Sequence, residues 1–168
     1  TGFGLLAFTN VTLGTAEVAL GFPFGTVPAN TPAIRIAGTV TVTETQWTVL
    51  EGALAGTDAV PPALAGSGDL LGGDPATVAL TNALPLSTTA LVIGLSELSA
   101  PFKGGVLVPA ADIVLAGLPT DASGDLSITL TWPVGVPAGV VVYWQHWVTD
   151  TGGPVGFEAS NAVSATTP

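Results

Sequence analysis

The sequence predicts an all-β protein, a jelly-roll-like β-sandwich of antiparallel strands with essentially no helix. Its apolar residues recur with a period of two, as they do on a half-buried strand. Many of them are β-branched, which suits a pleated surface. The 22 glycines and 14 prolines interrupt the apolar runs at short intervals. Many short strands separated by Gly, Pro and Asp clusters are typical of sandwiches.

The clearest alternation lies at residues 34–49. Ile36, Val40 and Val42 fall on one face there, while Thr39 and Thr41 fall on the other. A continuous strand of this length would exceed the usual five or six residues, so we expect it to bend or to bridge two sheets. Further strands are expected at residues 4–11, 15–20, 76–81, 90–95, 113–115, 126–132, 140–149 and 162–165.

Turn clusters separate these strands, at residues 65–69, 72–75 and 121–124. Residues 52–75 are rich in Ala, Gly, Pro and Asp and have little periodicity. The chain is therefore divided into an N-terminal β region, residues 1–75, and a C-terminal β-sandwich domain, residues 76–168. The stretch 52–75 is either the connection between two units or a long loop within one sandwich.

The inventory of reactive side chains is nearly empty. The only basic residues are Arg35 and Lys103, His146 is the only histidine, and there is no cysteine. Catalysis usually needs a nucleophile with a base beside it, a metal or an anion clamp. We therefore expect no enzyme, no catalytic residue, no cofactor and no metal site, although spacing alone leaves a hydrolase with paired carboxylates open.

Charge narrows the choice of partners. Only 8% of the residues are charged, against about 25% in an ordinary soluble protein. The net charge of −10 argues against nucleic acid, because two cations cannot neutralise a phosphate backbone. No apolar run is long enough for a membrane span. A surface so poor in charge favours other copies of the same chain as partners, and neutral polysaccharide stays compatible.

We expect an extracellular or cell-surface protein. A chain that starts at Thr1 is what removal of a signal peptide would leave, and trimming would leave the same. The scarcity of Lys and Arg also leaves few cleavage points for trypsin-like proteases.

The C-terminal half holds a recurrent set of short motifs. They include Gly104-Gly105-Val106-Leu107-Val108-Pro109, Tyr143-Trp144-Gln145-His146-Trp147 and Ser160-Asn161-Ala162. This set resembles the C-terminal β domains of secreted proteins from planctomycetes and similar bacteria. The resemblance covers roughly residues 76–168 and implies a β domain, with no activity to carry over.

Two weaker site hypotheses arise in the same half. Asp121, Ser123 and Asp125 have the spacing of the start of a calcium loop, but no bidentate acid follows, so a turn with a positive φ at Gly124 is the competing interpretation. Tyr143, Gln145 and Trp147 share one face of a strand and would suit a sugar platform. The competing interpretation is a core strand.

The N-terminal stretch is apolar on both faces of its predicted strand. Phe3 and Leu5 alternate with Leu6 and Phe8, so both faces need cover. Either its own sandwich or a neighbouring subunit would provide it. The function we expect is a secreted structural protein that self-assembles into a filament or surface layer, with Phe3, Leu5, Leu6 and Phe8 in the assembly strand. The alternative is a carbohydrate-binding surface module, which would use Tyr143, Trp144, Trp147 or Trp47.

Overall fold

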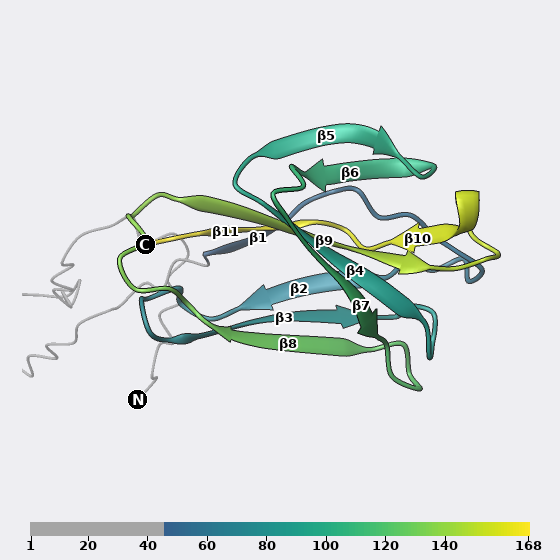
Figure 1. The fold of residues 1–168 in the computed structure, drawn as a ribbon, viewed down its shortest axis with the longest axis horizontal. Coiled ribbons are helices and arrows are strands. Elements are labelled where there is room, and N and C mark those ends of the chain that lie inside the picture. The colour runs from purple at the N-terminus through teal and green to yellow at the C-terminus, as the bar shows by residue number, and fades with distance from the viewer. Residues whose placement is uncertain (1–45) are drawn as a thin grey trace, which may run out of the picture. The chain divides into compact units, whose positions relative to one another are not determined.

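The computed structural model describes residues 46–168, and the predicted all-β antiparallel fold is confirmed there. This part of the chain forms eleven strands and one turn of 3-10 helix, Pro154–Gly156, with no α-helix among its residues (Figure 1). The strands predicted at residues 4–11 and 15–20, and most of the one at 34–49, lie outside the described residues.

The larger sheet has the order β1-β11-β9-β4-β7, and β10 pairs with β9 beyond the end of β11. Every neighbouring pair in it is antiparallel. The strands are β1 (Trp47–Val49), β4 (Thr88–Gly94), β7 (Ile113–Pro119), β9 (Val141–Thr149), β10 (Phe157–Ala159) and β11 (Val163–Thr166).

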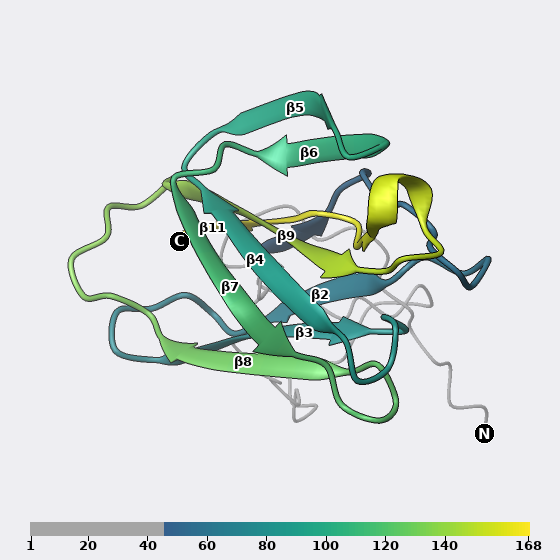
Figure 2. The same cartoon turned by 45° about the vertical axis from the view of Figure 1, so that its right-hand side comes forward.

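The smaller sheet, of order β2-β3-β8, packs against one face of the larger one (Figures 1 and 2). Its strands are β2 (Ala63–Ser67), β3 (Pro75–Thr81) and β8 (Leu126–Thr131). Alternate residues of β3 and β9 meet between the sheets, as the period-two pattern predicts. Buried side chains of this main core include Leu64, Val78, Leu80, Leu91, Trp132, Trp144, Val148 and Val163.

A hairpin covers part of the other face of the larger sheet (Figure 2). It consists of β5 (Glu97–Phe102) and β6 (Gly105–Pro109). Lys103 and Gly104, with φ of 48° and 86°, form its two-residue turn, and positive φ at both positions is the requirement of a type I′ turn. Leu107 of this hairpin packs with Val92, Trp147 and Ala159 in a second core cluster. Strand β9 is therefore covered on both faces.

The predicted boundary at residue 75 is wrong, because the sandwich includes strands on both sides of it. Strand β1 pairs with β11 and β2 pairs with β3, and the compact unit begins at Thr45. The turn predicted at residues 65–69 is largely strand β2. A Cβ on Gly66 would lie 1.8 Å from Cε3 of Trp47, so glycine at this position makes room for the indole. The stretch 52–75 thus contributes a strand to the sandwich rather than a connection between two units.

Candidate functional site

Strand β7 forms one end of the larger sheet, and among the described residues no strand pairs with its outer edge. Its inner edge pairs with β4 from Ile113↔Ile93 to Leu115↔Leu91. Beyond Leu115 the register shifts, so that Ala116 and Gly117 lie opposite the single residue Ala90. Gly117 has a φ of 78°, which fits a β-bulge with glycine in the left-handed region. We call the outer side of Ile113–Ala116, ahead of the bulge, the open edge.

The open edge exposes apolar side chains on consecutive residues. Ile113, Val114 and Leu115 are 54%, 51% and 43% exposed. Proteins usually protect an edge strand with charges, proline, a bulge or a cover. Here the bulge and Pro119 protect only the last part of β7, and residues 113–119 contain no charged side chain. Within residues 46–168, the first half of β7 thus offers unpaired backbone groups beside uncovered apolar surface.

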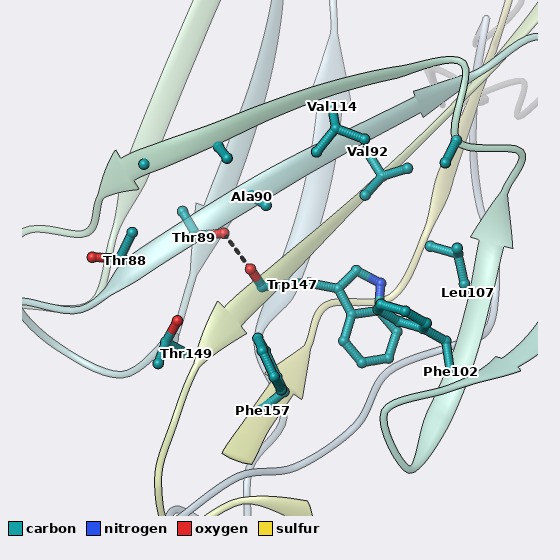
Figure 3. A pocket seen from close by; sticks show the side chains of 13 residues that line it. Thr88, Thr89, Ala90, Val92, Phe102, Leu107, Val114, Trp147, Thr149 and Phe157 are labelled. Carbon is teal, nitrogen blue, oxygen red and sulfur yellow. Dashed lines mark hydrogen bonds between the residues drawn. The ribbon is translucent and has the colours of Figure 1, made fainter. Parts of the chain in front are cut away.

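An apolar groove adjoins β7 on the outer face of the larger sheet (Figure 3). Its volume is about 350 Å³, and it lies between β7, β4 and the β5–β6 hairpin. Val114 and Ala116 line its β7 side. Opposite them lie aromatic rings, with the rings of Phe102 and Trp147 in edge-to-face contact at a centroid distance of 5.0 Å. The remaining lining includes Thr88, Ala90, Val92, Leu107, Thr149 and Phe157.

The two faces of the open edge lead to different surroundings. Val114 faces the groove, so the alternation of a strand places Ile113 and Leu115 on the opposite face, toward the smaller sheet. These two side chains are exposed there, although Leu118 further along the same strand packs against the main core. A strand added beside β7 would therefore meet apolar surface on both of its own faces.

Gln145, at the centre of β9, is fully buried, and its amide joins distant parts of the chain. Three carbonyl oxygens, of Gly52 (3.1 Å), Val106 (3.0 Å) and Ser160 (3.1 Å), surround its Nε2 and share its two N–H groups. Its Oε1 accepts from the backbone N–H of Val108 (3.0 Å) and from Nε1 of Trp147 (3.3 Å). One side chain thus holds the hairpin, the segment after β1 and the segment before β11 against β9.

This geometry corrects the predicted sugar platform. Trp147 is 4% exposed and Gln145 is completely buried, while Tyr143 is half-buried. Trp144 is buried in the main core, and Trp47 packs against it at a centroid distance of 6.4 Å. Tyr143, Gln145 and Trp147 therefore do not form an exposed binding surface, and the core-strand interpretation describes them.

His146 lies in the interior with one ring nitrogen paired. The Thr89 hydroxyl donates to the carbonyl of Trp147 (3.1 Å), so it accepts from Nδ1 of His146 (2.9 Å), which assigns the proton to Nδ1. Nε2 has no hydrogen-bond partner within residues 46–168. Burial lowers the pKa of His146 to about 4, so the ring is neutral at physiological pH. Because the Thr89 proton is committed to the Trp147 carbonyl and Nδ1 of His146 carries a proton, this pair is not arranged for the ring to act as a base toward the hydroxyl.

The loop at Asp121–Asp125 is a turn that connects the two sheets. Oδ1 of Asp121 accepts the backbone N–H groups of Ser123 (2.7 Å) and Asp125 (2.9 Å), which hold the pKa of this carboxyl below its ordinary value. Gly124 has a φ of 80°, as expected, and a Cβ there would lie 1.8 Å from the carbonyl oxygen of Ala83. The turn interpretation therefore describes this loop, although the turn is not that of a hairpin, since β7 and β8 belong to different sheets. No group of three potential metal-ligating side chains occurs among the described residues.

Two buried carboxylates, of Asp150 and Glu158, lie together near the C-terminal end of β9. Asp150 accepts hydrogen bonds from Thr57 Oγ1 (2.6 Å) and from the backbone N–H groups of Thr57 and Gly152. Burial raises the pKa of Asp150, but these bonds outweigh it, and the pKa lies below its ordinary value. Glu158 accepts from the Leu84 N–H (2.6 Å). Burial, aided by the charges of Asp150 and Asp58, raises the pKa of Glu158. Each carboxylate thus satisfies loop backbone groups, which is a structural use.

The assembly strand at Phe3, Leu5, Leu6 and Phe8 lies outside the described residues. The sequence predicts a strand at residues 113–115 but does not predict its exposure. These residues form a run that is apolar on both faces, and strands buried on both sides have the same pattern.

Comparison with known proteins finds no matching family model, no matching curated protein and no matching solved structure. In residues 46–168, no helix is long and apolar enough to cross a membrane.

Proposed function

We propose that this chain is an extracellular structural protein that self-assembles into a filament or surface layer by strand addition. The observation that carries the proposal is the open edge of β7, apolar on both faces and without charge. Such an edge is a template on which another chain adds a strand, because backbone hydrogen bonds and apolar burial act together.

The composition supports the same function. Only 8% of the residues are charged, so much of the surface is uncharged and suited to burial against other copies, although the net charge of −10 opposes their association. Asp121 and the buried pair Asp150 and Glu158 accept hydrogen bonds from loop residues, Asp121 from its own turn and the pair also from the distant Thr57 and Leu84. The groove is lined by aromatic, aliphatic and threonine side chains and by no titratable group. These features favour apolar association over chemistry on a substrate.

We also propose that the resemblance to secreted C-terminal β domains reflects a shared scaffold. Its motif residues hold this sandwich together: Ser160 Oγ accepts the His146 N–H at 3.0 Å, and Asn161 bonds both the N–H (2.8 Å) and the C=O (3.0 Å) of Leu64 in the smaller sheet. Replacing Asn161 by alanine should therefore lower the denaturation midpoint. An unchanged midpoint would contradict this account.

The test of assembly compares Leu115→Lys with Val134→Lys in the full chain. Leu115 lies on the open edge, whereas Val134 is 79% exposed in a loop between β8 and β9. Electron microscopy and analytical ultracentrifugation should show polymers for the unaltered protein and for Val134→Lys. Leu115→Lys should be monomeric, because an edge lysine blocks pairing.

Two results would contradict the proposed function. One is an unaltered protein that stays monomeric at high concentration. The other is polymers that form equally well with Leu115→Lys, which would show that assembly uses a different surface.

A further inference from the structure

We infer that the occupant of the open edge is the segment Phe3–Phe8 of a second copy, seated along β7 with side chains in the groove. This inference rests on the proposed function and names the two surfaces that meet. It is argued from the faces, the strand order and the length of chain before β1.

The first argument is the match of faces. A strand beside β7 would have one face over the groove, near Val114, and the other near Ile113 and Leu115. Both of its faces must therefore be apolar. Phe3, Leu5 and Ala7 would supply one face of such a strand, and Leu6 and Phe8 the other. Phe3 or Phe8 can reach aromatic partners there, because the groove is lined by Phe102, Trp147 and Phe157 (Figure 3).

The second argument comes from β8, which ends the smaller sheet and has a different pattern. Its Ser127, Thr129 and Thr131 are exposed, while Leu126, Ile128 and Leu130 are half-buried. A strand added to β8 would thus need one polar and one apolar face. The segment at residues 3–8 has no polar side chain, so it fits β7 and not β8.

The third argument is where the chain enters the sandwich. Residues 9–45 separate the donor segment from Gln46, and 37 residues can span up to about 120 Å when extended. The chain enters the larger sheet at β1, and β7 is the strand at the opposite end. Donor and acceptor are different segments of each copy. The contact is head-to-tail, and it repeats into an open filament where the rotation does not close.

Complementation tests the pairing directly. A donor-blocked chain, Leu5→Lys/Leu6→Lys, keeps its open edge, and an acceptor-blocked chain, Leu115→Lys, keeps its donor segment. Each should be monomeric alone, with an unchanged far-UV circular dichroism spectrum. Refolded together, they should give dimers that do not grow further, since only one donor and one acceptor remain compatible.

Cysteine pairs then locate the contact, since the chain has no cysteine of its own. Ala7→Cys on one copy and Ala116→Cys on another should be joined by a short bis-maleimide. The matched control is Thr129→Cys on β8. Because proximity raises the effective concentration, we expect roughly tenfold or more cross-linked dimer for Ala116→Cys than for the control.

The outcomes separate this inference from the proposed function. If the unaltered chain never polymerises, both fail. If the donor-blocked chain still polymerises, or if the cross-links favour Thr129→Cys, the inference fails and self-assembly stands. In the chain with both Ala7→Cys and Ala116→Cys, a cross-link that leaves the product at monomer mass would show that the segment covers its own edge. That result would overturn the claim of a second copy.

Discussion

Strands β9 and β7 lie in the same sheet with only β4 between them, yet their side chains are arranged in opposite ways. Central strand β9 buries the polar side chains of Gln145 and His146, while edge strand β7 exposes Ile113, Val114 and Leu115. Buried polar groups normally require partners, and exposed apolar ones normally require cover. Gln145 finds its partners within the chain. The open edge does not find its cover within the described residues, and in our proposal a second copy supplies it.

Removing the amide of Gln145 should have the largest effect on stability. Gln145→Leu leaves the Val108 N–H and the carbonyls of Gly52, Val106 and Ser160 without their partner. We expect the free energy of unfolding to fall by about 3–5 kcal/mol, because several buried polar groups lose their hydrogen bonds together. Urea denaturation measures it, with Ser127→Ala on exposed strand β8 as the control. A loss no larger than the control's would show that these groups are satisfied without Gln145.

Acidification tests the second buried polar residue of β9. The pKa of His146 is about 4 in the folded protein and about 6.5 when unfolded, so below pH 6.5 protons bind the unfolded state preferentially. Titration of His146 leaves the free energy of unfolding unchanged above pH 6.5 and lowers it by about 3 kcal/mol as the pH falls to 4. Thr89 keeps its bond to Trp147 in His146→Leu.

The measurement is the urea midpoint of the unaltered protein and of His146→Leu between pH 7.5 and 4. The difference between the two proteins isolates the histidine, since the carboxylates titrate in both. If both proteins lose stability equally over this range, the pKa of His146 is not lowered.

Glu158 should have a smaller effect on the free energy of unfolding, with the opposite dependence on pH. The pKa of Glu158 is raised, so the folded state holds this proton more tightly than the unfolded state, and ionisation at neutral pH costs stability. Glu158→Gln removes the charge and keeps an oxygen for the Leu84 N–H. We expect a gain of about 1 kcal/mol at pH 7 that disappears as the pH falls below the unfolded value near 4.5, measured by thermal and urea unfolding. A gain that is the same at pH 4 and pH 7 would contradict this cause.

The smallest effect on stability is expected on β7. Val114→Thr keeps a β-branched side chain at a position that is 51% exposed, so the free energy of unfolding should change by less than about 0.5 kcal/mol. The same change should weaken assembly, because it places a hydroxyl in the apolar groove. Unfolding at low protein concentration and sedimentation at high concentration give the two values. A large loss of stability in the monomer would mean that Val114 belongs to the core of its own subunit.

Several strands could be predicted from local pattern, and others could not. The alternation at residues 76–81 and 140–149 gives β3 and β9 within a residue or two. Strand β2 was missed because Ala65, Gly66 and Ser67 have poor strand propensity. What holds it is tertiary: Trp47 packs on Gly66 and bonds the Gly68 carbonyl at 2.9 Å, while Asn161 bonds Leu64.

The hairpin and the site show the same limit. Strands β5 and β6 were missed because Pro101 and Pro109 weaken their signal and because Lys103-Gly104 is not a usual hairpin dipeptide. The residues of the open edge are plain in the sequence. Their exposure depends on β7 being last in the sheet, which strand order decides and local pattern does not.

The strand order also sets when this sandwich can form. Strands β9 and β11, from the last part of the chain, lie between β1 and β4, which come from its middle. Strand β4 cannot pair with β9, and β1 cannot pair with β11, until residues 141–166 have been synthesised. The larger sheet therefore closes late and through contacts distant in sequence, a topology associated with slow folding.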